Sequence, residues 1–214
     1  MSTRKDPTHA LKKIKQSATG RHSKQKGASF EREVGVLLSE WLTRGVRRDL
    51  FSRNVLSGGR FTNALKKEEH ERAGGLAGDL MAAHPLAFQF LKLFIVECKH
   101  YADIQLHQYL MDTSGKSFLG EVIRTTGAQA RHANTEWMVV ARQNRMDTLL
   151  FMPSYIGMVA MNERCSPPIH LPDRFTRYHM LHSNTIMMVR LNEFLQNVDT
   201  DAFLAAISAV HTAV

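Results

Sequence analysis

An acidic residue and a lysine stand two positions apart at the end of a short apolar run. Residues 93–99 read Leu-Phe-Ile-Val-Glu-Cys-Lys, and such a run, rich in Phe, Ile and Val, predicts a buried strand. Because side chains alternate between the faces of a strand, Glu97 and Lys99 should share one face, and Cys98 should point into the core on the other. Burying a carboxylate and an ammonium costs free energy, so this strand end is a candidate site for chemistry.

A further acid lies in a helix predicted over residues 28–43. The apolar residues at 30, 34, 37, 38, 41 and 42 have helical spacing, and at about 100° per residue they form one arc. Glu31 falls inside this arc, whereas Glu33 and Glu40 fall outside it. An acid within a buried arc is unusual, and the alternative is an edge glutamate whose carboxylate reaches solvent.

The remaining pattern predicts an α/β fold around a mixed sheet. Strands are expected over residues 50–56, 76–83, 136–141, 148–152 and 186–191, and further helices over 117–134 and 201–211. Residues 85–93 should form a long hairpin or a short helical turn, and residues 161–183 a loop. An order of helix, three strands, helix and two strands is typical of α/β domains.

Most of the net positive charge lies at the N-terminus. Residues 1–26 contain eight basic residues and one acidic residue, a net +7 of the chain's +8. Few apolar residues, with Gly20 and Gly27, indicate a flexible basic tail, which binds a polyanion or, alternatively, only aids solubility. Two cysteines make no disulfide framework, and the chain shows no secretory signal or bilayer-length apolar run, so we expect a cytoplasmic protein of a bacterium or a phage-infected host.

These residues together resemble a known nuclease superfamily. The pattern resembles that of the PD-(D/E)xK nucleases: a helix glutamate, then Gly78-Asp79 on one strand and Glu97-x-Lys99 on the next. In this chain, Gly78 stands at the position of the proline in the superfamily's name. Residues 26–33, Lys-Gly-Ala-Ser-Phe-Glu-Arg-Glu, also resemble the start of archaeal-type Holliday-junction resolvases. The resemblance covers about residues 26–152. It implies that Asp79 and Glu97 bind the metal, that Lys99 is the active-site lysine, and that Glu31 completes the acidic cluster.

The implied chemistry is phosphodiester hydrolysis. Asp79 and Glu97 offer the hard oxygen ligands that suit Mg²⁺, with Mn²⁺ as an expected substitute. Such an ion lowers the pKa of bound water and neutralises developing negative charge. Lys99 can orient or help deprotonate the attacking water and stabilise the transition state, while Glu31 would bind water in the metal's shell or a second ion.

Several other residues are candidates for contact with the nucleic acid. Arg53, Ser57 and Arg60 stand where a loop could meet backbone phosphate. His100 and Tyr101 follow the lysine, and Gln129 and Arg131 lie on the next predicted helix; for these four, the alternative is an ordinary structural or surface role. The basic tail supplies the remaining candidates, Lys12, Lys13, Lys15, Arg21, Lys24 and Lys26.

We therefore expect a restriction-endonuclease-like α/β core, with a central mixed sheet flanked by helices and a basic N-terminal tail. The expected units are a flexible tail over 1–26, a nuclease core over 27–160, and a C-terminal extension over 161–214 packed on the same domain. The expected activity is Mg²⁺-dependent hydrolysis of branched or structured DNA by a homodimer. Alternatives are a sequence-specific restriction-like nuclease, an exonuclease, or a catalytically silent DNA-binding module.

Overall fold

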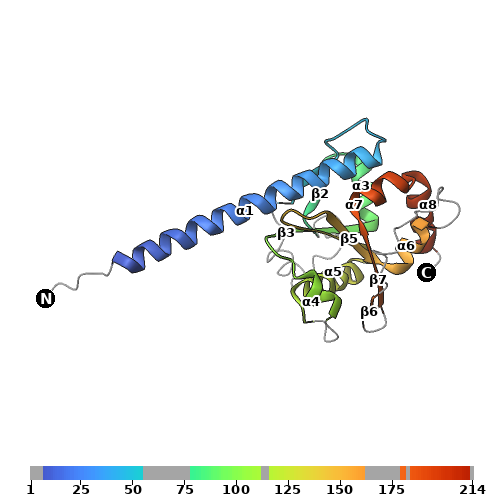
Figure 1. Cartoon of the computed structure of the whole chain (residues 1–214). Coiled ribbons are helices and arrows are strands. Elements are labelled where there is room, and N and C mark those ends of the chain that lie inside the picture. Colours follow the sequence, from blue (N-terminus) through green and yellow to red (C-terminus); the bar gives the residue numbers. More distant parts are fainter. Residues whose placement is uncertain (1–6, 55–77, 112–115, 162–178, 182–183, 213–214) are drawn as a thin grey trace.

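The computed structural model describes residues 7–54, 78–111, 116–161, 179–181 and 184–212. Their helices and strands are shown in Figure 1. In chain order they are α1 (Pro7–Leu42), β1 (Phe51–Arg53), β2 (Leu80–Ala82), α3 (Pro85–Leu93), β3 (Phe94–Tyr101), α4 (Leu106–Met111), α5 (Phe118–Ala133), β4 (Glu136–Gln143), β5 (Thr148–Pro153), α6 (Ser154–Met161), β6 (His179–Leu181), β7 (Asn184–Arg190), α7 (Leu191–Asn197) and α8 (Thr200–Thr212).

The central sheet is mixed, which confirms the expected fold class. Its strand order is β3-β4-β5-β7-β6; β3 pairs with β4 in parallel, and the other pairs are antiparallel. A parallel pair needs a long crossover connection, and the chain between β3 and β4 includes α4 and α5. Strands β1 and β2 form a separate antiparallel pair. That pair is joined to β3 where the Asp79 N–H donates to the Val96 carbonyl oxygen at 2.8 Å.

Strand β3 alternates between two packed faces, as its sequence predicts. Phe94, Val96 and Cys98 are buried in the main core, which also includes apolar residues of α1, α3 and α8. Ile95 packs on the opposite face against Ala130 of α5. This alternation places Glu97 and Lys99 on the α5 side of the strand, and Cys98, in the core, is excluded as a candidate ligand, as expected.

Helix α1 is longer than the sequence predicted. It begins at Pro7 and continues to Leu42, so residues 7–26, which we expected to form part of a flexible tail, are helical. Proline suits the first turn of a helix, the following stretch is rich in Ala, Lys, Gln and other tolerated residues, and no proline recurs before residue 85. Figure 1 shows the N-terminal part of α1 projecting away from the sheet. Among the α1 residues whose burial is described, Ala28 is the first buried one, and it lies at the helix start that the apolar pattern predicted.

Other predicted elements agree in kind, and three short helices were missed. The segment after β2 is the helix α3, in which Pro85 occupies the first turn and the His84 side chain accepts a hydrogen bond from the Leu86 N–H. Helices α4, α6 and α7 have only six to eight residues each, too few for a clear period. Most of the loop predicted over 161–183 lies outside the described residues, but His179–Leu181 form the strand β6, which was predicted wrongly as loop because three residues paired to β7 are too few to show a period. Among the described helices, none has the length and apolar character of a membrane span.

Candidate active site

Asp79 is held at the start of β2 by a backbone that requires glycine before it. Gly78 has φ +84°, and a Cβ on it would lie 2.6 Å from the Val96 carbonyl oxygen. Left-handed φ and close backbone contact both favour glycine, which explains why the proline of the superfamily's name is absent here. The Asn54 side chain, fully buried, donates to the Gly78 carbonyl oxygen at 2.9 Å. The Asn54 N–H donates to the Asp79 carbonyl oxygen at 2.8 Å, so Asn54 holds the backbone of both Gly78 and Asp79.

Three of the four expected catalytic residues, Asp79, Glu97 and Lys99, converge. Lys99 Nζ donates to Glu97 Oε1 and lies 3.4 Å from Asp79 Oδ2. Asp79 Oδ2 also accepts the backbone N–H of Cys98 at 2.8 Å. Asp79 is buried, with about 5% of its surface exposed, and the side chains of Glu97 and Lys99 are 19% and 22% exposed. The residues therefore form one compact, largely desolvated cluster that still reaches solvent.

The charges of this cluster perturb one another. Burial, and then the nearby Asp79 carboxylate, raise the pKa of Glu97 above its ordinary value. Burial alone would lower the pKa of Lys99, but the Glu97 and Asp79 carboxylates outweigh burial and the pKa is raised. Lys99 is therefore an ammonium at neutral pH, which suits a donor of hydrogen bonds and positive charge better than a proton acceptor.

Glu31 lies on the buried face of α1, as the helical arc predicted. It is 8% exposed, and its carboxylate accepts a hydrogen bond from Arg53 Nε. Burial raises the pKa of Glu31, the bond from Arg53 lowers it, and the Asp79 charge raises it again, with a net rise. Glu33 instead faces outward and pairs with Arg142. Glu31 is thus electrostatically coupled to Asp79 while its direct partner is Arg53.

The donor set fits a Mg²⁺ ion at Asp79 and Glu97. One Lys99 nitrogen reaches both carboxylates, so the two groups converge on one point, and Mg²⁺ in proteins is commonly held by one or two carboxylates and several waters. Within the described ranges, the hydrogen bonds to the Asp79 carboxylate all go to Oδ2, which leaves Oδ1 for a ligand. The same ranges contain no group of three or more His, Cys, Asp or Glu side chains arranged for a metal. The arrangement is therefore a candidate two-carboxylate site, and the carboxylate of Glu31 is bonded to Arg53 instead.

The other candidate residues are more dispersed. Arg53 contacts Glu31, and Lys26 Nζ donates to Asn144 Oδ1. Gln129 and Arg131 lie near the C-terminal end of α5. Among the described residues, no hydrogen bond or ion pair joins either to the catalytic cluster. The rest fall outside the described residues or have undescribed side chains, namely Ser57, Arg60, Lys12, Lys13, Lys15, Arg21 and Lys24.

One residue that positions the site was not predicted. Asn54 links the end of β1 to Gly78 and Asp79, yet 24 residues separate it from Gly78 in the sequence. The only local signal was a polar residue between Phe51 and Val55 within an expected strand. A buried amide must be hydrogen-bonded, but the sequence does not identify its partner.

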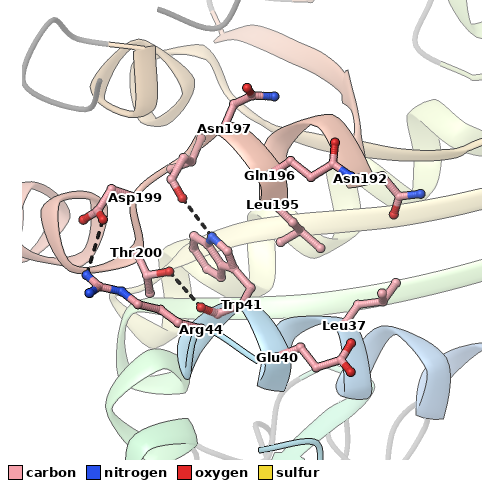
Figure 2. A pocket seen from close by; sticks show the side chains of 11 residues that line it. Leu37, Glu40, Trp41, Arg44, Asn192, Leu195, Gln196, Asn197, Asp199 and Thr200 are labelled. Atoms are coloured by element: carbon pink, nitrogen blue, oxygen red, sulfur yellow. Dashed lines mark hydrogen bonds and ion pairs between the residues drawn. The ribbon is translucent and has the colours of Figure 1, made fainter. Parts of the chain in front are cut away.

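A recess in the surface lies away from Asp79, Glu97 and Lys99. It has a volume of about 460 Å³ and lies between the end of α1 and the α7–α8 turn. Figure 2 shows Trp41 and Thr200 tying these elements together across it, while Arg44 pairs with Asp199. These bonds serve to attach the C-terminal helices to α1, and the recess contains none of the catalytic residues.

The helix, the adjoining strands and the Asp-Glu-Lys cluster together define a nuclease of the PD-(D/E)xK class. A family model described as phage putative PDDEXK endonuclease matches residues 22–204, and the chain belongs to that family. The match extends well beyond residues 26–152, over which the sequence resemblance was recognised. No curated protein and no solved structure gives a significant match.

Proposed function

We propose that the protein is a metal-dependent DNA endonuclease that hydrolyses phosphodiester bonds in branched or otherwise structured DNA. The observation that supports this most strongly is the convergence of Asp79 and Glu97 on Lys99 Nζ in a chain of the PDDEXK endonuclease family. Desolvated groups of opposite charge with shifted pKa values are typical of functional sites.

Each residue of the cluster has a distinct role in this proposal. Asp79 and Glu97 would hold Mg²⁺, or Mn²⁺ in its place. When bound, the ion supplies an activated water and charge neutralisation on the phosphate. The Lys99 ammonium donates to the attacking water or to a phosphate oxygen and stabilises the negative charge that develops there. Glu31 orients water at the edge of the site, and Arg53 fixes the Glu31 carboxylate.

The preference for structured DNA follows from the distribution of charge. Seven of the eight net positive charges belong to residues 1–26, most of which lie in the N-terminal part of α1 that projects away from the sheet. A basic projection binds phosphates without reading bases, so recognition depends on backbone shape. The resemblance of residues 26–33 to Holliday-junction resolvases supports the same substrate class. We further propose a homodimer, because symmetric cutting of two strands needs two sites, acting in the cytoplasm of a bacterium or phage-infected host.

The test is cleavage of a substrate panel by the full-length protein. Labelled duplex, flap, four-way-junction and single-stranded DNA are incubated with Mg²⁺, with Mn²⁺ and with EDTA. We expect internal cuts that need the metal and are fastest in a branched substrate. Absence of metal-dependent cleavage on every substrate would refute the proposal.

The same panel separates the alternatives. Cuts confined to one duplex sequence would indicate a restriction-like enzyme, and products shortened progressively from an end would indicate an exonuclease. Binding without any cleavage would indicate a silent DNA-binding module. The ionisable cluster argues against that last outcome, because a buried Asp, Glu and Lys are costly to retain without a use.

A further inference from the structure

A polar recess lies beside the C-terminal ends of β3 and β4. Its volume is about 490 Å³, within the range of ligand-sized cavities. It is bounded by β3, the β4–β5 hairpin and the start of α7. We call it the hairpin recess; its polar lining comprises His100, Arg142, Asn144, Arg145, Asp147, Thr148 and Asn192.

The hairpin recess and the catalytic cluster are neighbours on opposite faces of one strand. His100 follows Lys99 directly in β3, and alternation directs it away from the catalytic face. The ring of His100 lies 5.2 Å from that of Phe30 on α1. His100 is also in register with Arg142 on β4, so these two recess residues lie side by side near the C-terminal ends of β3 and β4.

Arg142 is held rigidly in the recess wall. Its Nη1 and Nη2 donate to both oxygens of Glu33, at 2.8 and 2.5 Å, and its Nε donates to Thr148 Oγ1 at 2.7 Å. The guanidinium also lies 4.8 Å from the centre of the Phe30 ring. This pairing matches the charge of Arg142 with that of Glu33, and it fixes the recess geometry before any ligand arrives.

Two other cations leave the recess with surplus positive charge. Lys26 Nζ donates to Asn144 Oδ1, which is a neutral amide oxygen. Arg145 is exposed and has no ion-pair partner within the described part of the chain. The acidic Asp147 beside it lies 3.2 Å from Arg190, which also pairs with Glu193 at 2.7 Å, so Asp147 offsets one of the two positive charges of Lys26 and Arg145. The pKa of His100 is lowered by burial, then by Lys26 and Arg142, which is consistent with an electropositive environment.

We propose that the hairpin recess binds a backbone phosphate of the DNA substrate, with Arg145 and Lys26 supplying the charge. This inference rests on the proposed function and adds a second point of contact to it. Lys26 and Arg145 are hydrogen-bond donors whose positive charge is not paired with a carboxylate among the described residues, and together they outweigh the single carboxylate of Asp147 in the lining, which suits a phosphate oxygen. Because phosphate contacts position DNA without reading sequence, the recess would orient the strand that enters the catalytic site.

The experiment measures the salt dependence of DNA binding. Full-length wild type, Arg145→Gln and Lys26→Gln/Arg145→Gln are titrated with a fluorescent duplex and a fluorescent four-way junction in EDTA, over a series of NaCl concentrations. Each phosphate contact contributes about 0.9 to the slope of log affinity against log salt for duplex DNA. We expect the slope to fall by about 0.9 for Arg145→Gln and by about 1.8 for the double variant.

Two controls make the result specific. Arg48 is an exposed arginine paired with Glu40 at 2.9 Å near the far end of α1, so Arg48→Gln should keep the wild-type slope. Arg145→Lys keeps the charge and should keep most of the slope. Circular dichroism and thermal melting confirm that each variant is folded.

The outcomes are separable from those of the proposed function. An unchanged slope for both recess variants, with DNA binding and cleavage intact in the wild type, would overturn the recess proposal alone. An equal loss in Arg48→Gln would also overturn it, because the effect would then be general charge. A wild type that neither binds nor cuts DNA would refute the proposed function, and the recess proposal with it.

Discussion

Replacing Gly78 with alanine tests how the backbone positions Asp79. Gly78 combines φ +84° with a close approach to β3, since an added Cβ would lie 2.6 Å from the Val96 carbonyl oxygen and 3.0 Å from Ile95 Cγ2. The alanine must either adopt an unfavourable left-handed conformation against a backbone clash or displace Asp79 from β3. We therefore expect losses of both stability and activity.

The size of the stability loss can be estimated from these two contributions. A left-handed conformation costs a non-glycine residue about 1–2 kcal/mol, and forcing an extra methyl group into a packed region costs about 1–3 kcal/mol. Together they predict a decrease of about 2–5 kcal/mol in the free energy of unfolding. This is a large part of the total, which is about 5–15 kcal/mol for a typical domain.

Two other glycines separate the contributions. Gly45, after α1, has φ +87° but no atom within 4 Å of an added Cβ, so Gly45→Ala should lose only the conformational part, about 1–2 kcal/mol. Gly27 lies within α1, and an added Cβ there also meets nothing within 4 Å. Gly27→Ala should therefore stabilise the helix by about 0.5–1 kcal/mol.

Urea denaturation followed by tryptophan fluorescence measures all three variants against wild type. The expected order of stability is Gly27→Ala, wild type, Gly45→Ala and then Gly78→Ala. A Gly78→Ala protein within about 0.5 kcal/mol of wild type, the range of ordinary surface substitutions, would refute the reasoning about Gly78. So would a Gly45→Ala loss equal to that of Gly78→Ala.

Further predictions concern the catalytic groups and the α1 projection. Lys99→Ala should lower the single-turnover cleavage rate by about 10²-fold or more, as expected for loss of a charge-stabilising donor, and Mg²⁺ affinity measured by calorimetry should change much less. Glu31→Gln should reduce cleavage, whereas Glu40→Gln on the same helix, outside its buried face, should not; equal effects would contradict the helix-face assignment. Because the Arg53 bond lowers the raised pKa of Glu31, Arg53→Gln should raise it further in a carboxyl ¹³C NMR titration, and a fall would contradict the assignment. Because the pKa of Glu31 is raised in the folded state, its contribution to the free energy of unfolding is fully present below the unfolded pKa of about 4.3 and is lost as pH rises through the folded pKa. Urea denaturation over this pH range should therefore show this loss of stability in the wild type, and Glu31→Gln should lack the part that Glu31 contributes. Deleting residues 1–24 should flatten the duplex salt slope by about 3–4 if about four of its basic residues contact phosphate, and an unchanged slope would leave the projection a solubility feature.

Periodicity predicted the parts of the site that depend on one element at a time. The alternation of residues 93–99 placed Cys98 in the core and Glu97 and Lys99 on the other face, because a strand has a fixed period of two. The helical arc placed Glu31 inside the buried face of α1 for the same kind of reason. These inferences needed no knowledge of the partner elements.

Features that depend on contacts between distant segments could not be predicted. Asn54 is buried because it bonds Gly78 across a long separation, and the hairpin recess depends on Lys26 meeting Asn144 and Glu33 meeting Arg142. Low hydrophobicity led us to expect a flexible tail over residues 1–26, whereas residues 7–26 are helical in the structure. The packed C-terminal part of α1 provides the costly helix nucleus, and residues of good helix propensity can then extend the helix toward the N-terminus without being buried themselves.

The most direct test of the central claim is single-turnover cleavage by Asp79→Ala and Glu97→Ala beside Asp49→Ala, an exposed acid paired with Arg47. DNA affinity in EDTA and thermal melting are measured for the same proteins. Both site variants should be folded, should bind DNA and should lack Mg²⁺-dependent cleavage, while Asp49→Ala should cut at the wild-type rate. Cleavage by either site variant at near the wild-type rate would contradict the assignment of Asp79 and Glu97 as the catalytic metal site.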